Sequence, residues 1–474
     1  MDLQQMEEFI LELIRDELDP ALSRDQSDYQ EIDAWRSFDD APLPSLHQGA
    51  GNEYTELAQM ARSPWLWTAT RRLAQNLKVS GYRGEDLQEN QPIWSKAWDA
   101  NNLDSLQLAA MADFVSYGLI YGVVLPGEPD PLGDPAEKRV SVRWASPTRS
   151  IALYEDPLSD PWPFVYMENF TRRGEEFSRV ILKDHVFTVA RATAKGRARL
   201  VEVKVLDGVP VTPVVAYRHV VNNQGDIHGI VKPAIGVTRR LQQTNFDRLT
   251  LQRFTSWSVR TIAGMKLDDD TAADEKLRLS IDSILISEDP DTKFGSMPAS
   301  PLDGILAATA ADIQNWCAHT QTAATDMLAT LVNVGPEAVA ASRVSATQLV
   351  DEWRSAAQAG HSTLLRLAGA LLGDESAARD VSSTIRWADT SPLSFAQLVD
   401  GLGKAAQMLD VPAEMLWERI PNWTVGDTVR AREIQARAKA ESPAQQVINS
   451  LDRQSQPAAL AAATPVTEKA AAQP

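Results

Sequence analysis

The chain of 474 residues contains one cysteine, Cys317, so it cannot form a disulfide within itself. This excludes a small secreted scaffold held by disulfides, and also a zinc ribbon, which needs several thiolate ligands. No run of about 18 apolar residues occurs, so we expect no transmembrane helix. The first residues, MDLQQMEEFILELIRDELDP, lack the basic start, long apolar run and cleavage site of a signal peptide. With apolar residues at 44%, the composition indicates a soluble protein with buried cores.

The sequence also lacks the motifs of several enzyme classes. No glycine-rich loop ends in Lys-Ser or Lys-Thr, which excludes a P-loop NTPase. The six histidines are scattered without the spacing of a zinc site, and no G-x-S-x-G motif presents a serine nucleophile. We therefore predict that the chain is not an enzyme and that it binds no cofactor.

Basic residues are fewer than acidic ones. There are 46 Lys and Arg against 64 Asp and Glu, and the formal net charge is -18. Proteins that wrap nucleic acid need clustered cations to neutralise phosphates, so this balance argues against tight DNA binding. It is compatible with a surface that DNA passes without adhering, because like charges repel over roughly 8–10 Å at physiological salt.

The N-terminal quarter of the sequence predicts helices joined by irregular chain. An apolar stripe from Leu3 to Ile14 indicates a first helix, which we expect Pro20 to end. Residues 21–53 are polar, and we expect an irregular arm anchored by Trp35 and Phe38. A helical stretch follows at 54–77, with a break near Pro64, and then a turn at 81–84.

An antiparallel β unit is predicted for residues 116–221, after a helix at 103–115. The unit consists of short β-branched and aromatic segments separated by Pro, Gly and Asp clusters. These segments are SYGLIYGVVLPG, VSVRWAS, SIALYED, PFVYMENF, VILKDHVFTVA, RLVEVKVL and, allowing for Pro213, VPVTPVVAYRHVV. Together with the flanking helices they predict an α+β, helix-rich fold.

Two long helices flank a small insert in the middle of the chain. The first, 232–260, has Pro233 in its first turn and carries Arg239, Arg240, Arg248 and Arg253, a local reversal of the overall charge. The insert, 261–301, is predicted to hold two strands, VRTIAGM and SILIS, an acidic run and a turn-rich stretch. The second helix is expected at 302–331. If the helices run antiparallel, the insert projects as a head on a two-helix stalk.

The last third of the sequence is predicted to be helical. The small residues at 332–344 indicate a mobile loop, and Ser345 with Gln348 has the spacing of a capping box that opens a helix ending at Gly373. Gly360 in the middle of this helix indicates a bend. A second capping box at Ser394 opens a helical unit that runs to about residue 440, and beyond it we expect disorder.

Along this order of helices, strands and insert, several local segments stand out: LAQNLKVSGYR, FVSYGLIYGVV, SPTRSIALYEDP, VPVTPVVAYRHV, SVRTIAGM with its Arg-x-x-x-Gly spacing, and SPLSFAQLVDGLGKAAQML near the C-terminus. The order of the parts and these segments resemble the SPP1-type portal proteins of tailed bacteriophages, particularly those of siphophages that infect actinobacteria. At the start of the first long helix, the segment HGIVKPAIG departs from the Gly-x-Ser-acidic-Leu pattern of many relatives.

The resemblance implies a division of the chain into the parts of a portal protein. These are an N-terminal wing (1–230), a first stem helix (231–260), a clip (261–301), a second stem helix (302–331), a tunnel loop (332–345), a kinked helix and return belonging to the wing (346–390), a helical crown (391–440) and a disordered tail (441–474).

The resemblance also implies a dodecameric ring at one capsid vertex, through which DNA is packaged and ejected. Expected partners are further copies of the chain, the major capsid protein, the large terminase subunit, the head-tail adaptor and double-stranded DNA without sequence specificity, but no membrane. The expected location is the virion, and the host cytoplasm during assembly.

The resemblance and the charge pattern together suggest three groups of functional residues. Tunnel-loop candidates are Asn333, Glu337, Ser342 and Arg343, stem candidates are Arg239, Arg240, Arg248 and Arg253, and clip docking candidates are Lys266, Asp268, Asp269, Asp270, Asp274 and Glu275. The alternatives are another head-completion or adaptor protein, a minor capsid protein and, remotely, a metal-dependent nuclease that uses the acidic cluster at 268–275.

Overall fold

The chain forms an α+β structure that divides into two compact units, Met1–Ala388 and Asp389–Pro474. The computed structural model describes residues 3–46, 51–84, 92–129, 131–132, 134, 136–192, 196–206, 208–256, 260–263, 293–296, 302–323, 343–388, 395–417, 420 and 425–440. The helix-rich α+β class predicted from the sequence is confirmed. Among the residues so described, no helix is long and apolar enough to cross a membrane.

The N-terminal segment is helical well beyond the expected first helix. It contains α1 (Leu3–Leu13), a π-helical turn (Ile14–Leu18), α2 (Asp19–Arg24) and α3 (Gln26–Arg36). Pro20 does not end the helix as predicted, because it lies in the first turn of α2, where its missing N–H costs little. The predicted irregular arm at 21–53 is therefore wrong for α2, α3 and the start of the next helix. Trp35 is buried as expected, but Phe38 is 54% exposed.

The predicted break near Pro64 is confirmed, since α4 (Asn52–Ala61) ends before it and α5 (Trp65–Asn76) begins after it. The turn predicted at 81–84 is instead largely part of β1 (Val79–Arg83), which pairs antiparallel with β12 (Thr384–Trp387). That pairing joins residues about 300 positions apart, so no local pattern could indicate it. A π-helical turn (Trp94–Trp98), a 3-10 turn (Asp99–Asn101) and α6 (Leu103–Tyr117) follow.

The predicted antiparallel β unit is confirmed and consists of two sheets. One sheet has the order β3-β2-β9, from β2 (Leu119–Pro126), β3 (Val140–Ala145) and β9 (Val214–Arg218). The other has the order β4-β5-β6-β7-β8, from β4 (Ser150–Leu153), β5 (Val165–Arg172), β6 (Glu175–Ile181), β7 (His185–Ala190) and β8 (Arg199–Val205). Every neighbouring pair is antiparallel. The segment VILKDHVFTVA is not one strand, because it turns between β6 and β7.

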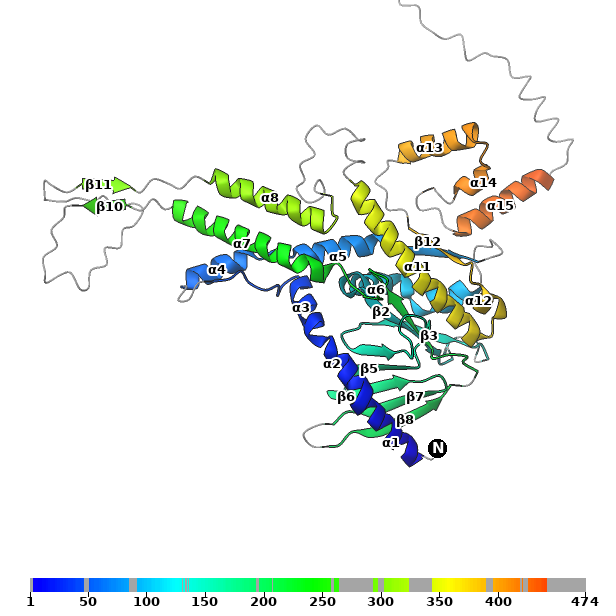
Figure 1. Cartoon of the computed structure of the whole chain (residues 1–474). Coiled ribbons are helices and arrows are strands. Elements are labelled where there is room, and N and C mark those ends of the chain that lie inside the picture. The colour runs from blue at the N-terminus through cyan, green and yellow to red at the C-terminus, as the bar shows by residue number, and fades with distance from the viewer. Residues whose placement is uncertain are drawn as a thin grey trace, which may run out of the picture. The chain divides into compact units, whose positions relative to one another are not determined.

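The N-terminal helices cover one face of the five-stranded sheet (Figure 1). Ile10 and Leu18 are fully buried there against Val165 and Val180. Arg191 fastens the helices to the sheet, because its guanidinium donates to Asp19 at 2.8 Å and to Ser178 at 2.8 Å.

The largest core lies where α11 (Val344–Leu372) packs on α6 and the three-stranded sheet. Phe114, Trp353 and Leu364 are fully buried in it. The capping box predicted at Ser345 is wrong, since α11 begins at Val344 with Arg343 as its N-cap and no side chain bonds as a cap. The short helix α12 (Glu375–Arg379) follows.

Helix α11 continues through Gly360, and the bend predicted at this residue stays a prediction. Gly360 lies against the ring of Tyr217, and a Cβ atom there would be 2.3 Å from a ring carbon. The glycine is therefore required by the close approach of the aromatic ring, a reason that depends on tertiary contact.

The central insert lies between two helices as predicted. Helix α7 (Val231–Ser256) leads to β10 (Arg260–Ala263), which pairs antiparallel with β11 (Lys293–Ser296), and α8 (Asp303–His319) follows. The expected strand SILIS lies outside the described residues, and β11 occupies a stretch predicted to be turns. Helix α8 ends at His319 instead of near 331, and Gln321 just after it has a left-handed φ of 51°.

The second unit is helical, as predicted. It contains α13 (Phe395–Met408), α14 (Ala413–Leu416) and α15 (Val425–Ala440). The capping box predicted at Ser394 and the expected disordered tail at 441–474 both lie outside the described residues.

Candidate functional site

The two helices that flank the insert form an antiparallel hairpin (Figure 1). Near its base, the Trp316 indole donates a hydrogen bond to Thr238 Oγ1 at 2.9 Å. Further out, Asp312 accepts from Thr244 Oγ1 at 2.7 Å and pairs with Arg240 at 2.9 Å. Residues later in α7 thus meet residues earlier in α8. The two helices that flank the insert are therefore antiparallel, as the stalk expectation requires, while most of the insert lies outside the described residues and its form as a head stays a prediction.

Both helices are anchored in a buried apolar cluster at the base of the hairpin. Leu241 of α7 and Trp316 of α8 are fully buried, and Trp35 of α3 and Leu66 of α5 belong to the same cluster. The Trp316 ring lies 5.4 Å from the Trp65 ring. Because these side chains come from four helices, the start of the hairpin is held rigidly by the body of the unit.

Two of the four predicted basic residues of α7, Arg239 and Arg240, have acidic partners in the same chain. Arg239 lies 3.5 Å from Glu31 and over the ring of Trp35, and Arg240 pairs with Asp312. These arginine side chains are 63% and 55% exposed, so each pair contributes about 0–1 kcal/mol. Their effect is to neutralise charge and to fix α3 and α8 against α7. Of the other two candidates, Arg248 is half-buried and Arg253 is exposed.

A polar cluster that the sequence analysis missed fastens α3 to α6 and α7. Arg36 Nη1 donates to Asp113 at 2.7 Å and Arg36 Nε to Asp33 at 3.0 Å. The Tyr117 hydroxyl also donates to Asp33, and burial raises the pKa of Tyr117. Lys232 at the start of α7 pairs with Asp28. The spacing of Tyr29, Ile32 and Trp35 is helical and could have revealed α3 in the sequence.

Of the other predicted functional residues, Arg343 alone lies within the described part of the chain. Arg343 is described and precedes the first turn of α11, where it is half-buried. Outside the described residues lie the tunnel-loop candidates Asn333, Glu337 and Ser342 and the clip candidates Lys266, Asp268, Asp269, Asp270, Asp274 and Glu275. Their roles stay predictions.

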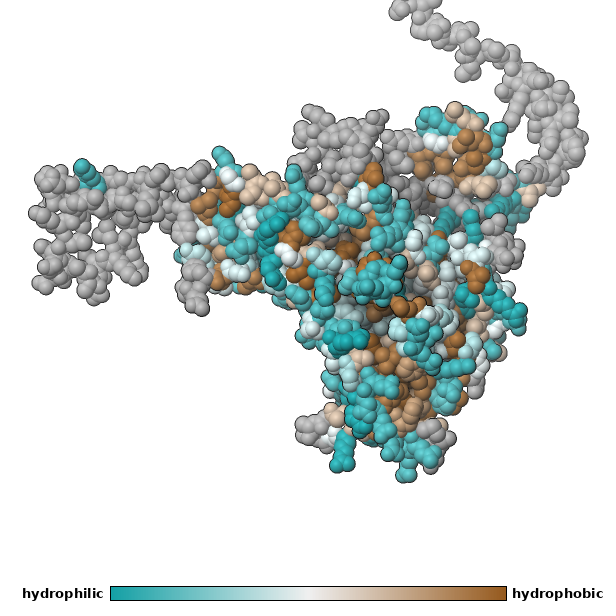
Figure 2. All heavy atoms as spheres, viewed as in Figure 1, coloured by the Kyte–Doolittle hydropathy of each residue, from teal (hydrophilic) through white to brown (hydrophobic). Residues whose placement is uncertain are grey.

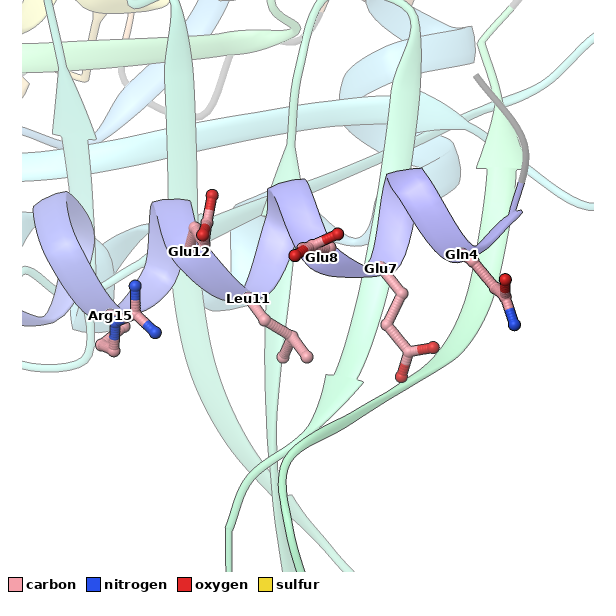
Figure 3. A pocket seen from close by; sticks show the side chains of 6 residues that line it. All are labelled: Gln4, Glu7, Glu8, Leu11, Glu12 and Arg15. Carbon is pink, nitrogen blue, oxygen red and sulfur yellow. The ribbon is translucent and has the colours of Figure 1, made fainter.

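One shallow hollow lies along the outer side of α1, lined by Gln4, Glu7, Glu8, Leu11, Glu12 and Arg15 (Figure 3). Glu7 is engaged there, since its carboxylate accepts from the Leu200 N–H of β8 at 3.0 Å. Within the described ranges, no group of three or more His, Cys, Asp or Glu residues could hold a metal ion.

The exposed surface of the hairpin is mixed in character. In Figure 2, hydrophilic residues lie over α7, and hydrophobic residues gather over the start of α8. Leu306 of α8 is 50% exposed, while Ala307, Ala308 and Ala311 beside it are exposed and small. Small side chains allow another helix to approach closely, so this side of α8 can accept a neighbouring helix.

Comparison with solved structures finds chains from gene transfer agent particles. One, titled as the virion of the native particle, is 13% identical with a TM-score of 0.41, and the match covers 80% of this chain and 99% of that chain. A chain from the neck of the empty particle, with C6 symmetry, is 13% identical with a TM-score of 0.43. This match covers 79% of this chain and 94% of that chain. A chain from the neck of the native particle, with C12 symmetry, is 12% identical with a TM-score of 0.41. This match covers 78% of this chain and 92% of that chain.

No curated protein matches the chain. The sequence does match the family described as "Phage portal protein, SPP1 Gp6-like" over residues 78–444, which is most of its length and includes the whole hairpin with its insert. The narrower resemblance to portals of phages that infect actinobacteria stays a prediction. From this match, the chain belongs to the SPP1 Gp6-like family of phage portal proteins.

Proposed function

We propose that copies of the chain form a dodecameric ring at one vertex of the phage capsid, through which DNA enters during packaging and leaves during ejection. The observation that carries the proposal is the antiparallel hairpin of α7 and α8, anchored at its base and ending in the small β10–β11 hairpin. A rigid stalk with one side of small residues is suited to packing beside identical stalks around a pore.

In the proposed assembly, residues 231–260 and 302–331 form the stem, 261–301 the clip and 332–345 the tunnel loop. The wing comprises 1–230 and 346–390, and this division is supported by the pairing of β1 with β12. The crown comprises 391–440, close to the boundary between the two compact units at Ala388. The clip would dock the large terminase subunit and later the head-tail adaptor, and the wing would face the major capsid protein.

The charge distribution suits a channel wall that DNA slides past. Arg239 and Arg240 have acidic partners within the chain, so they do not present uncompensated cations to phosphates. A chain of net charge -18 repels DNA overall, and Arg343 before α11 would supply a weak local contact. The proposed work is mechanical and involves no catalysis.

Electron microscopy of the purified full-length chain tests the ring directly. We expect closed rings with a central hole, and averaged end views should show twelve subunits. A monomer at all accessible concentrations would contradict the proposal. Terminase binding then separates a portal from an adaptor or minor capsid protein, and divalent-ion-dependent DNA cleavage by the pure chain would instead favour a nuclease.

The tunnel-loop assignment is tested by Arg343→Glu. The substitution adds negative charge next to the proposed DNA path, so we expect normal rings but altered DNA packaging or retention. Arg379→Glu, at a position 81% exposed on α12, provides a charge-matched control that should behave as wild type. Packaging at the wild-type level in the Arg343→Glu variant would refute the assignment.

A further inference from the structure

His219 lies at a junction between three segments of the first unit. It follows the last residue of β9 and begins the loop that leads to α7, and it is 8% exposed. Its ring stacks on that of Trp353 of α11, with the centroids 3.9 Å apart and the planes within 10°. Its backbone N–H donates to Gly118 O at 2.8 Å, which ties the start of the loop to the end of α6.

Both ring nitrogens of His219 face oxygen atoms that can only accept hydrogen bonds. Nδ1 lies 2.9 Å from the carbonyl oxygen of His228, and Nε2 lies 2.7 Å from Oε1 of Glu352. A neutral imidazole carries one N–H and can donate only one of these bonds, whereas an imidazolium donates both. Both hydrogen bonds can therefore form together only with an imidazolium, whose charge would also interact favourably with the indole face of Trp353.

These contacts join the segment before α7 to the first third of α11. Glu352 lies on α11 near its start and is exposed, while the neighbouring Trp353 is fully buried. The loop itself is closed at its base, since Val221 N donates to Asp226 O at 2.9 Å. A shift of α11 away from this loop would therefore have to break the bond between His219 and Glu352.

Among the described residues, Glu352 is the charged group bonded to the His219 ring. The charged groups on the adjoining elements have other partners. Arg218 of β9 donates to Pro157 O, and Arg354 of α11 donates to Asn76 O. Asp113 of α6 pairs with Arg36, and the side chain of His228 is exposed.

We propose that His219 and Glu352 form a protonation-dependent clasp between the loop that leads to α7 and the start of α11. With the ring protonated, both bonds hold and the clasp is closed. With the ring neutral, the bond to Glu352 or the bond to His228 must open, which loosens α11. Under the proposed function, the clasp connects the entrance of the stem to the helix that follows the tunnel loop.

Hydrogen exchange of the full-length chain tests the clasp without requiring a ring, DNA or terminase, so its failure is distinct from failure of the proposed function. Amide protection of residues 344–352 is measured at about pH 5.5 and pH 8.5, which span the range in which histidines change charge. Rates are normalised to the unfolded chain, and sedimentation confirms the same oligomeric state. We expect protection to fall roughly tenfold at the higher pH, as expected for losing a charge-assisted hydrogen bond.

Two substitutions distinguish opening of the clasp from a general loosening of the chain at high pH. Glu352→Gln offers an amide N–H to a neutral ring, so protection should stay at the low-pH level at both pH values. His219→Phe keeps a ring on Trp353 but donates nothing, so protection should stay at the high-pH level. His185→Phe, at a histidine that lies 2.9 Å from Asp184 on the sheet, is the matched control and should follow wild type. Equal protection of wild type at both pH values, or unchanged pH dependence in Glu352→Gln, would overturn the proposal.

Discussion

The buried carboxylate of Glu168 binds two arginine side chains between the two sheets. Its carboxylate, 8% exposed, accepts from Arg143 of β3, from Arg179 of β6 at 2.8 Å and from the Tyr166 hydroxyl at 3.1 Å. One buried carboxylate thus compensates two guanidinium groups. Such a group is costly to remove, because the partners left behind are charged and partly desolvated.

Glu168→Gln should therefore lower the free energy of unfolding by about 2–4 kcal/mol, since the amide leaves both arginines without a counter-charge. Urea denaturation measures the change. Glu375→Gln makes the same substitution in an exposed pair with Arg379 and should cost less than about 0.5 kcal/mol. Equal effects of the two substitutions would show that Glu168 is not the centre of a buried network.

Gly360 and Gly236 are helical glycines for which we expect opposite responses to alanine. Gly360→Ala should destabilise the chain by roughly 1–3 kcal/mol, because the new methyl group would overlap the Tyr217 ring. Gly236→Ala in α7 meets nothing within 4 Å and should stabilise it by about 0.5–1 kcal/mol. Thermal unfolding of both variants checks the signs, and stabilisation by Gly360→Ala would refute the close approach.

His361 should make the first unit sensitive to acid. Burial lowers the pKa of this histidine to about 3, and its Nδ1 lies 3.1 Å from the Tyr217 hydroxyl. Because the folded pKa lies below the unfolded value of about 6.5, the neutral ring's contribution is complete above that value and is lost as the pH falls toward 3. The loss approaches about 1.4 kcal/mol per pH unit.

Urea midpoints measured between pH 7 and pH 4 test this expectation. On acidification, the free energy of unfolding should fall more steeply with pH in the wild type than in His361→Gln. The difference in slope should correspond to the uptake of about one additional proton on unfolding. His319→Gln, at an exposed position at the end of α8, should retain the wild-type slope. A His361→Gln variant with the wild-type pH dependence would mean that the buried ring does not stay neutral.

At the scale of elements, the hairpin depends on a small number of buried contacts at its base. Trp316 contributes a fully buried ring and the hydrogen bond to Thr238, and it packs against helices from three other parts of the unit. The exposed ion pairs along α7 add little energy but fix the register of α7 against α3 and α8.

Trp316→Ala should accordingly cost about 3–5 kcal/mol, because it leaves a large cavity among α3, α5 and α7. Leu306→Ala on the half-exposed side of the same helix should cost less than about 1 kcal/mol. Hydrogen exchange should show that the first substitution loosens both α7 and α8. Retention of wild-type protection in the Trp316→Ala variant would mean that the hairpin is held by other contacts.

At the scale of the whole molecule, net charge opposes the proposed assembly of identical chains. Identical chains of formal charge -18 repel one another, and salt screens this repulsion with a Debye length that falls from about 10 Å at 0.1 M to about 3 Å at 1 M. The small, uncharged residues along α8 can pack without ion pairs. Assembly should therefore be favoured by salt.

Sedimentation velocity at about 0.05 M and 0.5 M sodium chloride tests this expectation. The oligomeric fraction should rise with salt, because screening reduces repulsion while apolar contacts persist. Dissociation at high salt would show instead that ion pairs between copies dominate the interface.

The sequence by itself determined the antiparallel strands, the two long helices and the small insert between them. Short segments rich in β-branched and aromatic residues identify β2, β3 and β5, and Pro233 marks the first turn of α7, because these patterns depend on neighbours close in the chain. The position of Arg239 and Arg240 on α7 was also evident, but their acidic partners were not.

Only the tertiary structure decided which distant segments meet. The sequence of residues 21–53 predicted an irregular arm because α3 is polar, and α3 is stabilised by contacts with Asp113, Tyr117 and α7. The close approach of the Tyr217 ring to Gly360 likewise has no signal in the residues near Gly360. The β1–β12 pairing and the bond of His219 to Glu352 likewise join residues far apart in sequence, and such contacts are specified by packing and charge in three dimensions, which local periodicity does not encode.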